Sequence, residues 1–343
     1  MPITIQHLAR ELGVSPMTVS YALRDFDRVA PETRKRVKTL ARELGYRPNS
    51  SAVSMRTGRA NSIGIVQSTN VECSGIAFGT LHGVQTEVSK HDLRLVMSQL
   101  PDMHLTDAEK MPRILREWSV DGVIMVYTHH EPPGLVTMLE NCFIPAVWLN
   151  SKFEHNCIYP DDYGSYFDAC TRLIEMGHRR IAYSIFGRNE HYSQTDRREG
   201  YLAAMRVAGL TPILHELPGV PDGVEGSVAM ADRVPLATRI LKRPDRPTAV
   251  LSYGGEACYT WVMAAHEVGL KVPGDLALAG TVDHPLDDLG FELGRLELPV
   301  YKMGREAVRV VMQRIEEPGE DVPASVIPFE IVPGDTFGPP RSK

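Results

Sequence analysis

Few residues of this 343-residue chain stand in patterns that support catalysis or metal binding. The adjacent carboxylates at 161–162 and 316–317 are of the type used in acid–base catalysis, but carboxylates in sequence pairs favour solvated positions. The His-His-Glu run at 129–131 offers metal-ligand side chains, yet adjacent loop residues seldom point toward one ion. Cys258 would need a histidine beside it to act as a nucleophile. Because the chain also lacks P-loop, GxSxG, HExxH and GxGxxG motifs, we predict that it is not an enzyme and uses no cofactor or metal.

The stretch VSPMTVSYALRD, early in the chain, is more informative. Ser15 is a strong helix N-cap residue, and Pro16 suits the first helical position, where a missing N–H costs nothing. Hydroxyl side chains and free N–H groups at such a helix start suit contacts with phosphate. Among the outward-facing residues, Met17 can contact a thymine methyl group and Tyr21 can reach a base edge. The lack of Asn, Gln and Arg at these positions predicts weak base readout by this helix alone, with specificity shared with DNA deformability.

Three short helical patterns fill residues 4–45. The first follows Thr4 as its N-cap and stops at Gly13, and the second begins after Ser15. The third begins at Pro31 and stops at a glycine. Two helices joined through a glycine turn, with a third helix to bury their apolar faces, form a helix-turn-helix.

Charge is unevenly distributed along the chain. Residues 1–60 contain 11 Lys and Arg against 5 Asp and Glu, a net charge of +6. The remaining residues contain 26 against 38, a net charge of −12. A basic head on an acidic body predicts that the head contacts a polyanion. The alternative is a helical cap whose basic surface is only solvated.

From Ser62 onward, short apolar segments alternate with helical stretches. Continuous apolar segments suit strands covered on both faces, and the helices between them indicate parallel sheets with right-handed crossovers. Seven such segments predict two sheets and hence two lobes, with a break near Asp161. Ligands in this architecture bind beyond the carboxyl ends of the strands, in the cleft between the lobes. The expected strands are 62–67, 93–98, 122–127, 145–150, 180–185, 248–253 and 276–281.

Composition and cysteine usage predict a cytoplasmic protein without membrane association. The chain is 43% hydrophobic and has no run of about 18 apolar residues. Its N-terminal sequence, MPITIQHLARELG, lacks the charged-then-apolar pattern of a signal peptide. The five cysteines are scattered without CxxC spacing, which argues against a disulfide framework or a zinc ribbon.

Several motifs resemble the LacI/GalR family of bacterial transcriptional regulators. In the head these are VSPMTVSYAL, ETRKRV and LGYRPN, followed by SSAVSMRTGRANSIGIV, which resembles the family's hinge and first body strand. In the body they are VDGVIMV, GHRRIAY, RREGYLAAM, PTAVLSY, GLKVPGDLALAG and LPVYKMGREAV. The resemblance implies an all-α three-helix helix-turn-helix domain (1–46) and a hinge helix or linker (47–60). It also implies an α/β two-lobed, periplasmic-binding-protein-like (type I) domain with parallel sheets (61–343).

The resemblance implies a function as well as a fold. It implies a transcriptional repressor that binds a palindromic operator in double-stranded DNA as a homodimer. A small-molecule effector, a sugar or sugar derivative, would bind in the cleft and control this binding. The first lobe would comprise about 61–160 plus about 291–322, and the second about 161–290 plus the C-terminal segment.

The helix at 16–23 would be the recognition helix in the major groove, with its hydroxyl residues mostly on phosphates. Residues 49–58 would form a hinge helix whose apolar wedge enters the minor groove. Met55 stands where the family usually has Leu, and Val53 where it often has Arg. The predicted DNA-contacting residues are Thr4, Ser15, Pro16, Met17, Thr18, Ser20, Tyr21, Arg24, Arg34, Asn49, Ala52 and Met55.

Polar residues that follow the expected strands are candidates for the ligand cleft. Arg197 is added by the resemblance, because it matches the arginine that forks onto ligand hydroxyls or carboxylates in sugar-binding members. The alternative for Arg197 is a surface salt bridge with Asp196 or Glu199. The predicted effector-contacting residues are Gln67, Ser68, Asn70, Thr128, Asn150, Asp161, Arg197, Tyr253 and Asp283, with His129 as a further polar residue after a strand.

The chain departs from the family at two cleft positions. Gly254-Gly255 replaces an Asn-Asp pair, and Val282 replaces a carboxylate before Asp283. Two side chains that often hold sugar hydroxyls are therefore absent, which leaves open a less hydroxylated, bulkier or anionic ligand, or none. Rival interpretations of the whole chain are a small-molecule-binding protein and an α/β enzyme with a helical cap.

Overall fold

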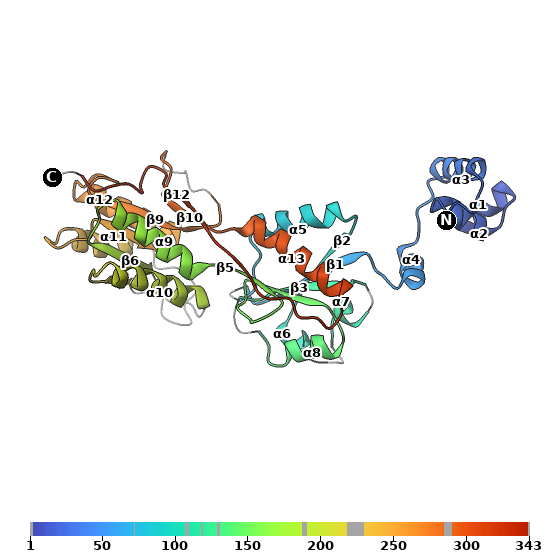
Figure 1. Cartoon of the computed structure of the whole chain (residues 1–343), viewed down its shortest axis with the longest axis horizontal. Coiled ribbons are helices and arrows are strands. Elements are labelled where there is room, and N and C mark those ends of the chain that lie inside the picture. Colours follow the sequence, from blue (N-terminus) through green and yellow to red (C-terminus); the bar gives the residue numbers. More distant parts are fainter. Residues whose placement is uncertain are drawn as a thin grey trace. The chain divides into compact units, whose positions relative to one another are not determined.

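The computed structural model describes residues 3–71, 73–105, 107, 110–117, 119–128, 131–186, 191–217, 230–284 and 290–341. The chain forms two compact units, Met1–Ala60 and Asn61–Lys343 (Figure 1). The first unit is helical, and the second contains two β-sheets. Each unit has hydrophobic clusters of its own.

The helices of the first unit are α1 (Ile5–Leu12), α2 (Pro16–Leu23), α3 (Pro31–Glu43) and α4 (Ser50–Thr57). Thr4 caps α1, since its hydroxyl accepts a hydrogen bond from the N–H of His7 at 3.2 Å. Gly13 ends α1 in the left-handed region, at φ 65°, which permits the tight turn into α2. Apolar residues of the first three helices, among them Leu8, Val19 and Val37, form one buried cluster.

The strands of the second unit are β1 (Ser62–Ser68), β2 (Arg94–Leu100), β3 (Gly122–Val126), β4 (Ala146–Leu149), β5 (Cys157–Pro160), β6 (Ile181–Phe186), β7 (Ile213–Leu217), β8 (Ala249–Ser252), β9 (Ala277–Val282), β10 (Arg295–Glu297), β11 (Ser325–Ile327) and β12 (Glu330–Val332). They form two six-stranded sheets, one in each lobe. The first sheet has the order β11-β5-β4-β3-β1-β2, with parallel pairings. The second has the order β12-β10-β9-β8-β6-β7, parallel except for β10 with β12.

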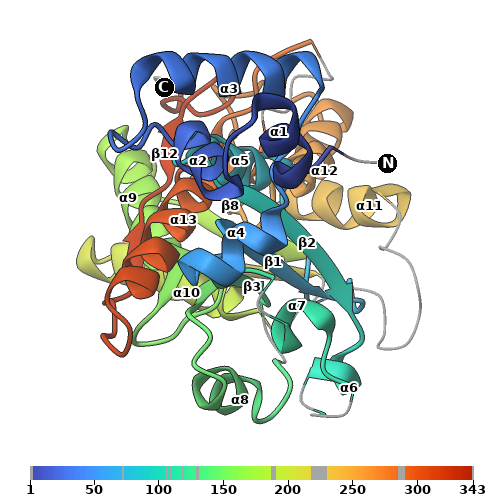
Figure 2. The ribbon, with the colours of Figure 1, turned by 90° about the vertical axis from the view of Figure 1, so that its right-hand side faces the viewer.

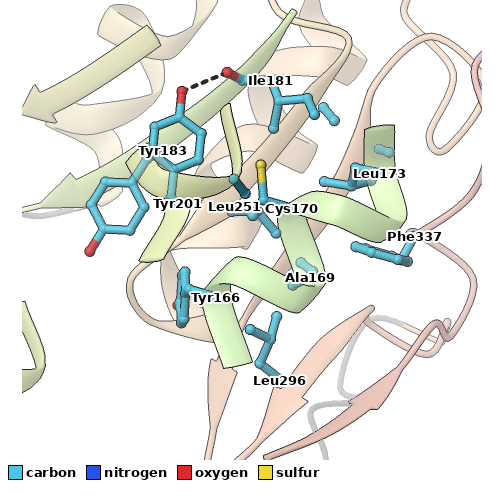
Figure 3. Close-up of a cluster of buried hydrophobic side chains, with 14 of the residues drawn as sticks. Tyr166, Ala169, Cys170, Leu173, Ile181, Tyr183, Tyr201, Leu251, Leu296 and Phe337 are labelled. Carbon is cyan, nitrogen blue, oxygen red and sulfur yellow. Dashed lines mark hydrogen bonds between the residues drawn. The ribbon is translucent and has the colours of Figure 1, made fainter. Parts of the chain in front are cut away.

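The helices of the second unit are α5 (Phe78–Lys90), α6 (Asp102–Leu105), α7 (Arg113–Arg116), α8 (Leu135–Asn141), α9 (Asp162–Glu175), α10 (Tyr192–Val207), α11 (Met230–Leu241), α12 (Gly255–Glu267) and α13 (Val300–Glu316). In the first lobe, α5 and α13 share a core with one sheet face, and α7 and α8 with the other (Figure 2). In the second lobe, α9 and α10 pack on one face, and α11 and α12 on the other. Figure 3 shows the cluster around α9, where the Tyr201 hydroxyl donates to the Ile181 carbonyl at 2.9 Å.

The chain passes between the lobes three times, and each passage is a short segment. The passages lie between β5 and α9, between β10 and α13, and between β11 and β12. The return segment of the first lobe therefore runs from α13 to β11, about 300–327, rather than the expected 291–322. This shift arises because β10 pairs with β9 of the second sheet, and β11 pairs with β5 of the first.

All seven expected strand segments overlap strands of the two sheets, namely β1, β2, β3, β4, β6, β8 and β9. The sequence prediction missed β5, β7, β10, β11 and β12. These strands are three to five residues long and mix polar with apolar residues, as in ILHEL for β7 and RLE for β10. So short a segment has no periodic pattern that distinguishes it from a loop.

Glu87 links α5 to α13 within the first lobe. Its carboxylate lies 2.8 Å from Nε of Arg305, 3.4 Å from Nε of Arg309 and 3.1 Å from Nζ of Lys90, and its side chain is 6% exposed. The hydrogen bond from Arg305 is the main reason that the pKa of Glu87 falls to about 2, although burial opposes this shift. The ionised carboxylate therefore stabilises the packing of these two helices.

We expect Glu87→Gln to lower the free energy of unfolding by about 2–3 kcal/mol at pH 7. Because the folded pKa lies below the usual glutamate pKa of 4.5, this stabilisation is present above pH 4.5 and is lost as the pH falls toward about 2. Denaturant unfolding of wild type and variant at pH 7 and pH 3 measures the effect, and the difference should shrink at pH 3. Glu316→Gln, at an exposed acid of α13, is the control. An equal loss at both pH values would contradict the ion-pair explanation.

Candidate functional site: the second helix and a cavity between the sheets

The N-terminal turn of α2 presents hydroxyl and apolar side chains to solvent. Ser15 and Pro16 are exposed, and the side chain of Met17 is 63% exposed. The Ser15 hydroxyl accepts from the N–H of Thr18 at 3.0 Å and lies 2.9 Å from the Thr18 hydroxyl. Val19 faces the core, so the exposed and buried faces of α2 follow its helical period. This surface can meet both phosphate and base-edge groups.

Tyr21 and Arg24 are more constrained than the sequence indicates. The Tyr21 ring is half-buried and lies 5.3 Å from the Phe26 ring, centroid to centroid. The Arg24 guanidinium carbon lies 5.3 Å from the Tyr21 centroid and 4.9 Å from the Phe26 centroid. Arg24 also donates from Nε to the Ser20 carbonyl at 3.1 Å. Its charge is thus held at the C-terminal end of α2.

Arg34 has a structural role in the turn after α2. Its Nη1 donates to the Asp25 carbonyl at 3.0 Å and to the Asp27 carboxylate at 3.2 Å. Lys38 lies 2.5 Å from the Asp25 carboxylate, and this hydrogen bond is the main reason that the pKa of Asp25 is lowered. Any contact from Arg34 to a phosphate would therefore compete with these bonds.

Helix α4 has no described residue that is buried. The N–H of Ala52 lies 3.5 Å from the Asn49 side-chain oxygen, a weak N-cap contact. The Met55 side chain is 90% exposed, and Ala52 is exposed as well. An uncovered apolar residue on a helix this short is consistent with a role that requires a partner.

A cavity of about 410 Å³ lies in the second unit and is lined by residues from both lobes. From the first lobe it takes residues of the β1–α5 connection and residues at the ends of β3, β4 and β5. From the second lobe it takes residues at and after the ends of β8 and β9. Carboxyl ends of parallel strands thus form its walls, as this architecture predicts. Four predicted effector-contacting residues lie on the wall, and these are Asn150, Arg197, Tyr253 and Asp283.

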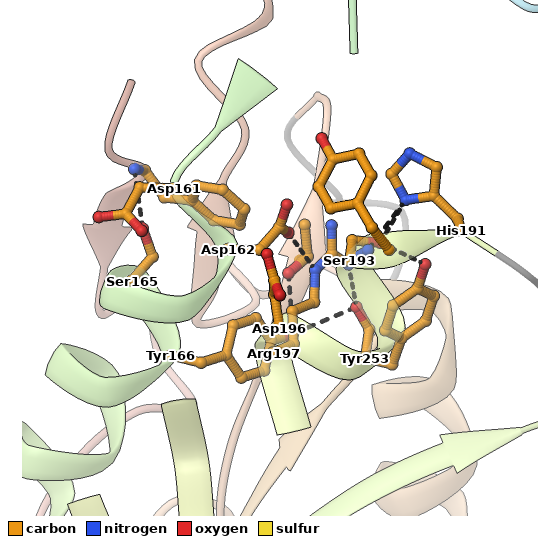
Figure 4. Close-up of polar contacts among 12 residues, drawn as sticks. Asp161, Asp162, Ser165, Tyr166, His191, Ser193, Asp196, Arg197 and Tyr253 are labelled. Carbon is orange, nitrogen blue, oxygen red and sulfur yellow. Dashed lines mark hydrogen bonds and ion pairs between the residues drawn. The ribbon is translucent and has the colours of Figure 1, made fainter. Parts of the chain in front are cut away.

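Arg197 is the buried cation of the cavity, with its side chain 8% exposed (Figure 4). Its Nε donates to Asp162 at 2.6 Å, and its Nη1 donates to the Tyr253 carbonyl at 2.7 Å. Its guanidinium carbon lies 4.4 Å from the Tyr253 ring centroid, within cation–π distance. The alternative pairing with Asp196 or Glu199 is wrong, since the partner of Arg197 is Asp162.

Asp162 is 1% exposed, and so the prediction that the carboxylates at 161–162 are solvated is wrong for this residue. Burial raises the pKa of Asp162, and the charge of Arg197 opposes this rise. Its second oxygen, Oδ2, has no hydrogen-bond partner among the described residues. No local pattern singles out Asp162, because its partner Arg197 lies 35 positions away on another helix.

Other cavity residues are held by contacts across the lobes. The Tyr192 hydroxyl, from α10, donates to the side-chain oxygen of Asn150 at 3.0 Å, and Asn150 follows β4. Lys152 lies 2.6 Å from the Asp196 carboxylate, again joining the first lobe to α10. A ligand that alters the approach of the lobes must therefore rearrange these two contacts.

The remaining predicted effector-contacting residues do not line the cavity, and these are Gln67, Ser68, Asn70, Thr128 and Asp161. The Ser68 hydroxyl donates to Asp102 at 2.5 Å, and the Thr128 hydroxyl donates to the Cys73 carbonyl at 3.1 Å. Asp161 caps α9. His129, and with it the His-His part of the 129–131 run, lies outside the described residues.

Sequence reasoning missed four polar residues of the wall, which are Thr80, Glu256, Thr281 and His284. His284 lies one position beyond the predicted residue Asp283, and Glu256 lies three positions beyond Tyr253, so a wider window after each strand would have found both. Gly254 and Val282 also line the cavity, as the family departures imply. A Cβ at Gly254 would meet no atom within 4 Å, so the missing side chain leaves open space.

Three further observations on the described part of the chain concern Cys258, metal-binding clusters and membrane-spanning helices. Burial raises the pKa of the Cys258 thiol to about 12, which opposes a nucleophilic thiolate. The described residues contain no cluster of three or more metal-binding side chains. None of the described helices is long and apolar enough to cross a membrane.

Two family models match the chain. The model described as bacterial regulatory proteins of the lacI family matches residues 4–49, and the periplasmic binding protein-like domain matches residues 170–337. The HTH-type transcriptional regulator AglR of Rhizobium meliloti (strain 1021) is 33% identical over 81% of this chain and 77% of its own length. The probable repressor ExuR of Bacillus subtilis (strain 168) is 28% identical over 92% of each chain.

Solved structures agree with these matches at the level of the fold. The lac repressor dimer bound to operator and the anti-inducer ONPF has a TM-score of 0.76 at 20% identity, covering 98% of this chain and 100% of that one. The complex of the regulator CelR with cellobiose has a TM-score of 0.60 at 24% identity, covering 97% and 99%. The helical head, the two parallel-sheet lobes and the sequence matches agree, and the chain therefore belongs to the LacI family of bacterial transcriptional regulators.

Proposed function

We propose that this regulator represses transcription as a homodimer on a palindromic operator, and that a sugar or sugar derivative in the cavity sets its operator affinity. The observation that carries the proposal is the presence in one chain of an exposed helix start at α2 and a cavity whose walls come from two lobes. The lac repressor structure pairs a relative with operator DNA, and the CelR structure pairs another with cellobiose.

On the DNA side, α2 supplies the contacts in the major groove. The Ser15 and Thr18 hydroxyls at the start of the helix bind phosphates, and the Met17 side chain contacts a thymine methyl group. Met55 of α4 enters a minor-groove base step and kinks the duplex. The predicted DNA-contacting residues of the head act together, with Arg24 and Arg34 held in place by contacts within the unit.

On the ligand side, the effector binds between the lobes and favours one of their relative arrangements. The coupling free energy is the difference in effector affinity between the operator-bound and free states. In a dimer, a change in the lobes alters the separation of the two α4 segments and hence their fit to the minor groove. The contacts from Lys152 to Asp196 and from Tyr192 to Asn150 cross the cavity and respond to that change.

A second candidate is a repressor of this family that has lost its ligand. The observation that favours it is the replacement of two expected side chains by Gly254 and Val282 on the cavity wall. A thermal-shift screen of sugars, sugar acids and sugar phosphates separates the two candidates, because only a ligand-binding chain is stabilised by a compound.

Operator binding should weaken steeply as salt rises. The first unit carries a net charge of +6, and each phosphate neutralised by Lys or Arg releases counterions. Sequencing the DNA that purified protein retains from a random pool should return a palindrome. Affinity for that site, measured from about 50 to 200 mM salt, should fall by a factor of about 10³ or more. A flat dependence, or retention of no palindrome, would count against the proposal.

Met55→Gly should reduce operator affinity and DNA bending, because the exposed apolar wedge is lost. Gel phasing of operator fragments measures the bend. Met103→Gly removes another exposed methionine, which is 72% exposed, from the second unit and serves as the control. If Met55→Gly left the bend unchanged, the assignment of the wedge would be wrong.

The double variant Asp162→Asn/Arg197→Gln should keep operator binding but lose the response to the effector. Removing both charges together avoids a buried unpaired charge, which single Asp162→Asn or Arg197→Gln would create at a cost of about 3–5 kcal/mol. Thermal unfolding of the single and double variants checks this order of stability. Fluorescence anisotropy on operator DNA, with and without effector, checks the function. Retention of a full effector response by the double variant would rule out a role for the pair in ligand binding.

A further inference from the structure

We propose that the cavity takes an aminated sugar, whose protonated amine is bound by carboxylates, and does not take an anionic sugar. The inference rests on the proposed effector role of the cavity and narrows its ligand by charge. It depends on which charges of the wall are already neutralised and which are not.

Arg197 is already paired within the protein. Asp162 lies 2.6 Å from its Nε, and the Tyr253 carbonyl accepts from its Nη1 at 2.7 Å. Aromatic rings enclose the guanidinium further, with the centroids of Tyr253 at 4.4 Å and of Phe329 at 5.7 Å. An anionic ligand that used the remaining N–H groups of Arg197 would face the negative charge of Asp162, which weakens its binding.

Asp162 places a negative charge beside Arg197. Its side chain is fully buried and does not line the cavity, and its Oδ2 has no hydrogen-bond partner among the described residues. This carboxylate repels an anion that approaches Arg197 from the cavity. Asp161 and Asp196 add negative charge around the same group, and Lys152 is engaged with Asp196 at 2.6 Å.

The wall near the second sheet is also acidic. Glu256 begins α12 after β8, and Asp283 follows the neighbouring strand β9, so both lie at the same edge of the sheet. Glu256 has no ion-pair or hydrogen-bond partner within the described ranges, and both side chains belong to exposed residues. Asp283 lies 2.5 Å from His284 Nδ1, and His284 is the other ionisable residue of this edge among the described residues that line the cavity. This edge of the cavity therefore carries two carboxylates and one histidine, and this balance favours a positively charged group on the ligand.

The charge balance of the cavity therefore selects against anions. The positive charge of Arg197 on the wall is offset by the carboxylate of Asp162 behind it. The carboxylates of Glu256 and Asp283 remain, and His284 can offset the charge of at most one of them. Carboxylates at a binding site repel an anionic ligand and so lower its affinity. An ammonium group offers three hydrogen-bond donors and one positive charge, which matches the carboxylate acceptors at this edge of the cavity. The space left by Gly254 is on this same edge and accommodates the group.

A matched series of hexoses tests the charge preference on the full-length chain. Isothermal titration at pH 6 measures the affinity for glucosamine, glucose and glucuronate and for the three corresponding galactose compounds. We expect the better hexosamine to bind about tenfold more tightly than its parent sugar, and the hexuronate to bind more weakly than either. In Glu256→Gln/Asp283→Asn, the preference for the amine over the parent sugar should fall from about tenfold to about onefold. In the control Glu140→Gln/Glu316→Gln, at exposed acids off the cavity wall, the preference should persist.

The outcomes separate this inference from the proposed function. The inference would be overturned, with a sugar effector left in place, by any of three results. These are equal affinity for amine and parent sugar, tighter binding of the hexuronate, and an unchanged preference in Glu256→Gln/Asp283→Asn. Binding of no sugar of any charge, with operator binding intact, would overturn the inference and the sugar effector together.

Discussion

The buried ion pair between Asp162 and Arg197 is the interaction on which the cavity depends. It joins the first residue of α9 to the middle of α10, and through the Tyr253 carbonyl it also fixes the end of β8. Neither charge has water to replace its partner, so losing one member would destabilise the lobe. The pair thus sets the cavity wall in place, and it also removes the positive charge that an anionic ligand would require. Structure and ligand class follow from the same contact.

The two functional surfaces of the chain use opposite electrostatics. The head carries a net positive charge and presents hydroxyl and apolar groups at α2, so most of its affinity for DNA comes from phosphates and little from base-specific charges. The cavity wall carries Glu256 and Asp283, and of these two only Asp283 has an ionisable partner among the described residues, His284. This separation keeps the polyanion at the head and leaves the acidic body for a small ligand. Communication between them then requires a mechanical route through the lobes, because charge alone does not couple the two surfaces.

The sequence predicted the fold more fully than the site, for physical reasons. Apolar segments alternate with helices, and this local pattern predicts seven strands and the strand ends where Asn150, Tyr253 and Asp283 lie. Edge strands of three residues depend on pairing with distant strands and leave no local pattern. Ser68 also follows a strand, but its hydroxyl turns to Asp102 of another segment. The partner of Arg197 was hidden for the same reason, since only the packing of α9 against α10 brings Asp162 to it.

The central claim is that cavity and operator are linked in one molecule, and linkage is reciprocal. The most direct test measures the affinity of the best-binding hexose for the protein alone and for the protein saturated with operator, by titration calorimetry at one salt concentration. The account predicts that the two affinities differ, and that their ratio equals the factor by which the same sugar changes operator affinity. Equal sugar affinities in the two states, from a protein that binds both ligands, would contradict it.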